Sequence, residues 1–297
     1  TTPLGDNQVS SPIFVELKRA ASAPASAPAS QPAAHPRAGR VFVASENGNL
    51  YAINPADGQV LWTHTDRNAI KASPAYFDSP LGGRVVIGSK YGAVRCLDAR
   101  TGAAVWSYKT PHWVDGAAAV TRIGMRMTVL VGSYDTNLHA LDALSGQPLW
   151  SYRTAGGVYS SPAIVPLPGG MDSERERGPT PQLLFASWDH HLHCVNSRDG
   201  SLSWSAFLGR PLWDSITLGD STWSSPVAAE LNSRVMIYVG SYAGPFYAIP
   251  LDEAADKALA RPSSNLRFWV TLPLVVLAVV VVTLLITRRH RRQHKRS

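Results

Sequence analysis

The sequence predicts an all-β fold, a β-propeller of four-stranded blades, joined to one C-terminal transmembrane helix. Three observations lead to this prediction. A segment that ends in tryptophan recurs at near-regular intervals, only 16% of the residues are charged beside many Gly, Pro, Trp and Tyr residues, and one long apolar stretch lies near the C-terminus. The length of 297 residues is sufficient for one large all-β domain or two ordinary ones.

The tryptophan-ended repeat is the strongest of these signals. In each copy an apolar strand, a turn, a strand that ends in Asp or Asn, and a glycine turn lead to the tryptophan. Full copies occupy residues 40–62, 84–106, 128–150 and 183–204, and a partial copy occupies 235–249. The closing residues are 44, 44 and 54 positions apart and are Trp62, Trp106, Trp150 and Trp204. We expect these docking tryptophans to lie between neighbouring blades, where a large ring buries much area.

A short lead-in of small residues precedes each copy and supplies a fourth strand. It occupies residues 72–75, 160–163 and 224–227, with a degenerate form at 116–119 and a further copy at 10–13. Small side chains suit this strand because inner strands crowd around a propeller axis. Four strands in about 44 residues are typical of a propeller blade, so we expect about five blades.

The blades are predicted to occupy residues 1–250, with two interruptions. Residues 18–39 are a Pro/Ala/Ser-rich run that we expect to be disordered, and residues 166–181 are a polar loop insertion. The sequence starts without Met or a signal peptide, at a point that follows an outer strand in the repeat. We therefore expect an incomplete propeller, a fragment that further blades and a signal segment precede.

An apolar segment near the C-terminus predicts a membrane anchor. Residues 268–286 contain no charged residue and would span about 28 Å as a helix, close to the thickness of a bilayer core. We predict a juxtamembrane linker at 251–267, a transmembrane helix at 268–287 and a basic cytoplasmic tail at 288–297. A buried core helix is the alternative. The propeller of this single-pass membrane protein would be extracytoplasmic, and periplasmic if the cell is bacterial.

The positive charge of the chain is concentrated in the tail. The formal net charge is +7, and six Lys and Arg residues lie among the last ten residues, which contain no acid. Without these six charges the other 287 residues carry +1. A nearly neutral propeller does not favour binding to nucleic acid.

The repeat resembles the quinoprotein-type, or PQQ-like, propeller repeat. Ala140, Asp142, the Ser145-Gly146 pair and Trp150 match its docking motif, Ala-x-Asp-x-x-[Ser/Thr]-Gly-x-x-x-Trp. The resemblance covers most of residues 8–250. This family includes pyrroloquinoline-quinone alcohol dehydrogenases and the non-enzymatic outer-membrane assembly lipoprotein BamB, so the resemblance implies either a membrane-bound PQQ-dependent dehydrogenase or a BamB-like binding scaffold.

The cysteines argue against the dehydrogenase. The resemblance implies adjacent cysteines near the quinone, a catalytic Asp and Glu, Asn and Asp ligands for calcium. The chain has only Cys96 and Cys194, both at the strand position that Ala52 and Ala140 hold in other blades. We interpret the two cysteines as packing residues that form no disulfide. We therefore expect no catalytic residue and no cofactor.

One histidine-rich segment invites a metal-site interpretation. Residues 189–194 contain three histidines, an aspartate and a cysteine, which are common metal ligands. His191 and His193 share one face of the predicted strand, and the corresponding positions elsewhere hold ordinary polar strand residues such as His139. We therefore favour a solvated strand face and predict no metal site.

A second set of polar residues invites an acid–base interpretation. Its members fall one to a blade at the same turn position and are Asn54, Asp98, Asp142 and Asn196. Side chains of this kind bond to nearby backbone N–H groups in turns. We predict that they stabilise turns and do not converge on an active site.

Aromatic residues outside the repeat consensus are the best candidates for binding. They lie in or near the predicted connections between blades and are His112, Trp113, Trp213 and Trp223. Exposed Trp is enriched at binding hot spots, but packing between blades is an equal alternative. We expect a non-catalytic, membrane-anchored scaffold that binds a protein or ligand at one propeller face, in envelope assembly or sensing. A sensory subunit of a receptor is a further alternative.

Overall fold

The computed structural model describes residues 10–17, 39–165, 181–207, 225–231, 234–240 and 246–252, which form five antiparallel sheets. The first sheet joins β1 (Ile13–Glu16), β2 (Gly39–Ala44), β3 (Asn49–Ile53) and β4 (Val60–Thr65). The second joins β5 (Ala75–Ser79), β6 (Gly82–Gly88), β7 (Ala93–Asp98) and β8 (Ala104–Lys109). The third joins β9 (Ala119–Ile123), β10 (Arg126–Gly132), β11 (Asn137–Asp142) and β12 (Pro148–Arg153). The fourth joins β13 (Ala163–Val165), β14 (Gln182–Ala186), β15 (His191–Asn196) and β16 (Leu202–Phe207).

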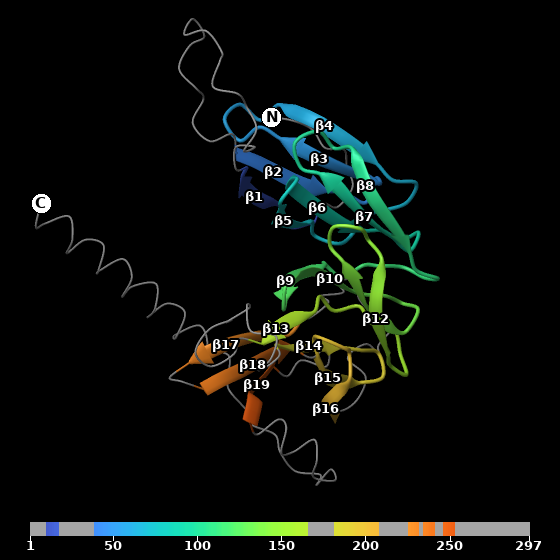
Figure 1. Ribbon diagram of the computed structural model, residues 1–297, viewed down its shortest axis with the longest axis vertical. Coiled ribbons are helices and arrows are strands. Elements are labelled where there is room, and N and C mark those ends of the chain that lie inside the picture. The colour runs from blue at the N-terminus through green and yellow to red at the C-terminus, as the bar shows by residue number, and fades with distance from the viewer. Residues whose placement is uncertain are drawn as a thin grey trace, which may run out of the picture.

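The fifth sheet joins β17 (Val227–Leu231), β18 (Arg234–Gly240) and β19 (Phe246–Pro250). In every sheet the spatial order of the strands equals their order in the chain, which is the meander of a propeller blade. The sheets follow one another along an arc (Figure 1). The first strands of neighbouring blades are in contact from β5 to β9, from β9 to β13 and from β13 to β17. The protein is therefore an all-β propeller with its first strands on the inner side, as the sequence predicts.

The apolar core lies between neighbouring blades. One cluster joins Val94 and Trp106 of the second blade to Val129 and Leu141 of the third. Along each blade the docking tryptophan lies directly opposite a small residue on the preceding strand, in the pairs Ala52 with Trp62, Cys96 with Trp106, Ala140 with Trp150 and Cys194 with Trp204. The strand register shifts just after each of these pairs. Alanine or cysteine at this position leaves room for the indole.

The docking tryptophans reach the glycine turn of the next blade. Trp106 Nε1 donates a hydrogen bond to the carbonyl oxygen of Ala143, 2.9 Å away. A Cβ atom at Gly146, in the same turn, would lie 2.6 Å from the Trp106 ring, and Gly146 has a φ of +73°. The indoles of Trp62 and Trp150 repeat the hydrogen bond to Ala99 and Ser197. This glycine therefore serves two purposes, the left-handed backbone of the turn and the close approach of the ring.

The polar residue that begins each of these turns caps it, as the sequence predicts. Asp142 Oδ1 accepts hydrogen bonds from the backbone N–H groups of Leu144 and Ser145. Asp98 accepts the equivalent bonds and also pairs with Arg84 at 2.7 Å. Burial raises the pKa of Asp98. The Thr101 hydrogen bonds and the Arg84 charge lower it by a larger amount, so the pKa lies below its usual value.

Several predicted segments fall outside the described residues. They include residues 18–38 and 166–180 of the two predicted insertions and the whole segment 253–297. Gly39, predicted to end the first insertion, is instead the first residue of β2. Among the residues that the structure places, no helix has the length and apolar character needed to cross a bilayer.

Candidate functional site

One end of the propeller carries His112 and Trp113, two of the four aromatic residues that the sequence singled out. We call this end the connection face: among the described residues it carries the turns between the second and third strands of the first four blades and the connections that join these four blades. Antiparallel order places these segments at the same end of the sheets, and hydrogen bonds join them. The backbone N–H of Tyr134, in the turn after β10, donates to the carbonyl oxygen of Trp113, in the connection between β8 and β9, at 2.9 Å.

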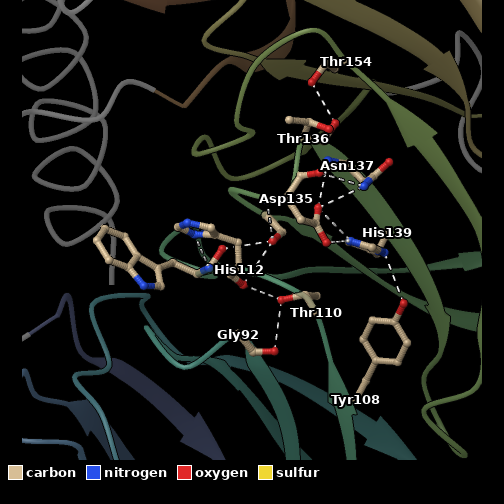
Figure 2. Close-up of polar contacts among 11 residues, drawn as sticks. Gly92, Tyr108, Thr110, His112, Asp135, Thr136, Asn137, His139 and Thr154 are labelled. Carbon is tan, nitrogen blue, oxygen red and sulfur yellow. Dashed lines mark hydrogen bonds and ion pairs between the residues drawn. The ribbon is translucent and has the colours of Figure 1, made fainter.

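His112 and Trp113 lie exposed on this face, in a connection held by hydrogen bonds. Thr110 Oγ1 lies 3.0 Å from the carbonyl oxygen of Gly92 and 2.6 Å from that of His112, so its hydroxyl ties the connection to the neighbouring turn (Figure 2). The backbone N–H of Trp113 donates to His112 Nδ1 at 2.9 Å. The side chain of Trp113 is left 40% exposed. The structure therefore brings these two predicted residues together at the surface.

Three further aromatic residues, which the sequence analysis missed, complete an aromatic patch of His112, Trp113, Tyr134, Tyr159 and Trp188. Tyr134 is its centre, because its ring stacks on His112 at 5.3 Å and contacts Trp113 and Trp188 at 5.1 Å each. Trp188 stacks on the buried Tyr159 at 4.1 Å and is itself 36% exposed. The patch spans three blades.

A signal for the missed residues exists in the repeat. Tyr134 and Trp188 occupy the position after the serine of the turn between the second and third strands, where the first two blades carry Glu46 and Lys90. The residue type thus changes from charged to aromatic at one repeat position, and only the register of the repeat could have shown it.

Charged groups flank the aromatic patch on the side of the first two blades. The Lys90 ammonium lies 5.2 Å from the centre of the Trp113 ring, a cation–π contact, and Lys71 pairs with Glu46 at 3.3 Å. Asp115 Oδ1 is buried and has no hydrogen-bond partner among the described residues. Burial raises the pKa of Asp115, although Lys90 and Lys71 act in the opposite direction. Burial and the nearby Asp115 charge raise the pKa of the Tyr134 hydroxyl.

The prediction that His191 and His193 lie on a solvated strand face is wrong for His193, which is buried with 5% of its surface exposed, whereas the His191 side chain is 36% exposed. His139, at the equivalent position of the third blade, is also buried, with 7% exposed. His139 Nε2 lies 2.9 Å from the Asp135 carboxylate and its Nδ1 lies 3.3 Å from the hydroxyl of Tyr108, which comes from the preceding blade (Figure 2). Because an ionised carboxylate only accepts, His139 Nε2 donates to Asp135, while Nδ1 lies within hydrogen-bond distance of the tyrosine hydroxyl. The histidines thus link neighbouring blades.

The next interface repeats this arrangement. His193 Nε2 lies 3.0 Å from the Asp189 carboxylate, and its Nδ1 lies 3.3 Å from the hydroxyl of Tyr152. Burial raises the pKa of Asp189, but the hydrogen bond and charge of His193 lower it more, to about 2. Within the described parts of the chain, no three His, Cys, Asp or Glu residues are placed to hold a metal ion.

The two cysteines lie in the blade cores. Both are free and completely buried, Cys96 in the cluster between the second and third blades and Cys194 in that between the fourth and fifth. Burial raises the pKa of both thiols to about 12. They are therefore poorly reactive packing residues. Trp213 and Trp223, the other two binding candidates, lie outside the described residues.

Comparison with known families agrees with this architecture. The family described as outer membrane protein assembly factor BamB matches residues 16–153 and, in a second alignment, residues 77–281. The two matches together cover most of the chain. The chain belongs to the BamB family. The overlap of the two matches has a physical origin, since a repeated blade can align to the same family in more than one register.

A solved structure shares the fold of this BamB-family chain. The crystal structure of the computationally designed Ika8 protein is 15% identical, with a TM-score of 0.52 over 71% of this chain and 55% of that one. BamB from Moraxella catarrhalis is 19% identical, with a TM-score of 0.46 over 70% of this chain and 57% of that one. The chain thus spans little more than half the length of either protein. No curated protein matches the chain.

Proposed function

We propose that this BamB-family chain is a non-catalytic, extracytoplasmic propeller that is tethered to a membrane and binds a protein partner through its connection face. The observation that carries the proposal is the aromatic patch, in which Trp113 and Trp188 remain 40% and 36% exposed although both rings contact other aromatic side chains. Trp and Tyr that cluster near the centre of a surface, with polar groups around them, are typical of protein-binding hot spots.

The charges on this face indicate the chemistry of the partner. Arg67, Lys71 and Lys90 lie on the turns and connections of the first two blades and Lys109 ends β8, against the acids Glu46, Asp66 and Asp115, of which Asp66 pairs with Arg95. Lys109 lies over the exposed ring of Tyr91 and donates to its carbonyl oxygen at 2.5 Å. A partner that presents carboxylates beside an apolar or aromatic side chain would complement this face.

The membrane tether rests on the sequence. The uncharged segment 268–286 has the length of a bilayer-spanning helix, and the basic tail that follows favours a cytoplasmic C-terminus. The propeller would then face the opposite side, which is the periplasm in a bacterial cell. The name of the family suggests a role in outer membrane protein assembly there, with the partner drawn from that process.

The cysteine pattern supports the non-catalytic part of the proposal. The PQQ dehydrogenases that share this repeat would need adjacent cysteines near the quinone, whereas Cys96 and Cys194 are buried between different pairs of blades. The residues present therefore do not fit that cofactor. Adding pyrroloquinoline quinone and calcium to the purified full chain should produce no substrate-dependent dye reduction, and sustained reduction would contradict the proposal.

Site-specific cross-linking tests the connection face. A photo-reactive benzophenone amino acid would replace the exposed Tyr91 on this face or, in a matched control, the exposed Leu81 at the opposite end of the same blade. In cells that make the full chain, we expect a discrete adduct from position 91 that is lost when Trp113→Ala and Trp188→Ala are added. Adducts that form equally from both positions, or that persist in the double variant, would refute the assignment.

A further inference from the structure

The end of the propeller opposite the connection face has a different apolar surface. We call it the hairpin face: among the described residues it carries the β5–β6 and β9–β10 hairpin tips of the second and third blades and the glycine turns between the third and fourth strands of the first four blades. Backbone hydrogen bonds join the two kinds of segment, from Ala143 N–H to the Met127 carbonyl at 2.9 Å and from Ala99 N–H to the Gly83 carbonyl at 3.0 Å. The most exposed side chains of this face are Leu81 and Met125, although the aromatic Phe14 is also exposed there, beside Gly39 and Pro55.

Two hairpin tips on neighbouring blades expose an apolar side chain almost completely. Leu81 is 81% exposed in the turn between β5 and β6, and Met125 is 83% exposed in the turn between β9 and β10. Leu231, at the corresponding end of β17, is 55% exposed, and Leu144 on the third blade is 47% exposed. Hairpin tips ordinarily carry small or polar residues, and the Leu81 and Met125 side chains contribute little buried area to the fold.

Two ion pairs lie behind the tips. Arg84 pairs with Asp98 at 2.7 Å, and on the third blade Arg126 lies 3.7 Å from Asp142. Exposed Arg100 and Arg122 also lie at this end of the second and third blades. The face therefore offers a neighbouring surface apolar tips with cationic side chains beside them.

The described chain leaves the fifth blade at the hairpin face. β19 is antiparallel to β18, and Asp252, just after β19, pairs with Arg234, the first residue of β18, at 2.8 Å. Arg234 follows the hairpin turn after β17, so Asp252 lies at the same end of the propeller as the hairpin tips. Fifteen residues then separate Asp252 from the apolar segment that begins at Phe268. The described chain therefore ends at the face that carries the exposed tips, and the segment of the proposed tether follows it in the sequence.

We propose that the hairpin face rests on the lipid surface of the membrane that holds the chain, with Leu81 and Met125 inserted at the boundary between head groups and acyl chains. This inference depends on the tether that we propose as part of the function. Insertion of the tips would remove apolar surface from water and orient the propeller, so that the connection face and its aromatic patch point away from the bilayer.

Depth-dependent quenching of a fluorophore tests this orientation. The full chain carrying Met125→Cys would be labelled with the environment-sensitive dye NBD and reconstituted in vesicles of phosphatidylcholine and phosphatidylglycerol at about four to one. Cys96 and Cys194 do not compete for the label, because both thiols are fully buried. The matched control carries the label at Tyr91→Cys on the connection face. We expect spin-labelled lipids to quench the dye at position 125 several-fold more strongly than at position 91, and aqueous iodide to do the reverse.

A second substitution shows whether the neighbouring tip contributes. Leu81→Asp, added to the Met125→Cys chain, should reduce quenching by lipid to the level seen at position 91, whereas Leu81→Ile should preserve it. The fold should be unaffected because the Leu81 side chain is almost fully in water. Equal iodide quenching at positions 125 and 91 would overturn the inference. Protection of position 125 from iodide that Leu81→Asp leaves unchanged would also overturn it. Protection that depends on protein concentration would overturn it too, because it would indicate that a second copy of the chain, and not lipid, covers the tips.

Extraction of the same vesicles at alkaline pH separates this inference from the tether. A chain that resists extraction while both labels stay aqueous retains its tether and overturns the lipid contact. A chain that is extracted, but whose position 125 is quenched by lipid before extraction, supports the lipid contact and overturns the tether. Extraction together with aqueous labels overturns both.

Discussion

The contact between Trp106 and Gly146 makes the stability of the blade interface predictable. A Cβ atom at Gly146 would lie 2.6 Å from the indole ring, and the φ of +73° is unfavourable for any other residue. The left-handed backbone costs an Ala about 1 kcal/mol, and displacement of the packed ring costs about 1–3 kcal/mol more. We therefore expect Gly146→Ala to reduce the free energy of unfolding by about 2–4 kcal/mol.

Removing the indole should make the same substitution much less harmful. Trp106→Leu keeps an apolar side chain but loses the hydrogen bond to Ala143 and part of the buried ring, at a cost of about 2–3 kcal/mol. In that background a Cβ at Gly146 no longer meets the ring, and only the backbone cost of about 1 kcal/mol remains. The double-mutant cycle should therefore give a coupling energy of about 1–3 kcal/mol.

Denaturant unfolding of the full chain in a mild detergent, followed by circular dichroism, measures the cycle. The matched control pairs Gly146→Ala with Trp62→Leu, because the Trp62 ring docks on Gly102 and not on Gly146. We expect the control pair to be additive within about 0.5 kcal/mol. If the Trp106 and Gly146 substitutions are additive, the Trp106 ring does not restrict the space at position 146. The inference that the indole packs against this turn would then be wrong.

Three further predictions follow from other contacts. Thr136 has a φ of +75° at the turn position where the second blade has Gly92, so Thr136→Gly should raise the free energy of unfolding by about 1 kcal/mol in the same assay. Gly92→Thr should lower it, because a Cβ there would lie 2.5 Å from two carbonyl oxygens, and a stabilised variant would contradict this. The folded pKa of Asp189, about 2, lies below its usual value, so its stabilisation of about 1–2 kcal/mol is present at neutral pH and is lost as the pH falls from roughly 5 to 2. Asp189→Asn should remove this part of the pH dependence of unfolding, and an unchanged pH profile would refute it. Cys96 should react with a maleimide only on unfolding, at the rate of global unfolding, and rapid labelling of the native chain would show that the blade core opens locally.

The blades were predictable because their signals are local and repeated. A glycine after an Asp-containing turn and a tryptophan at a set distance reflect contacts within one blade or with the next, so they recur in the sequence at the blade period. The capping role of Asp98 and Asp142 followed in the same way, since their partners lie two or three residues away. The candidate site was less predictable, and only His112 and Trp113 were found of its five aromatic residues.

The strands, the turns and the membership of a propeller family could be read from residue order, because backbone conformation at Gly and Asp and the alternation of apolar residues act over short distances. Which polar side chains are buried depends instead on how the blades pack together. His139 and His193 are polar residues on a strand, and it is the tyrosine of the preceding blade that covers each of them. The aromatic patch has the same origin, because Trp113 and Trp188 meet at Tyr134 only when neighbouring blades pack side by side.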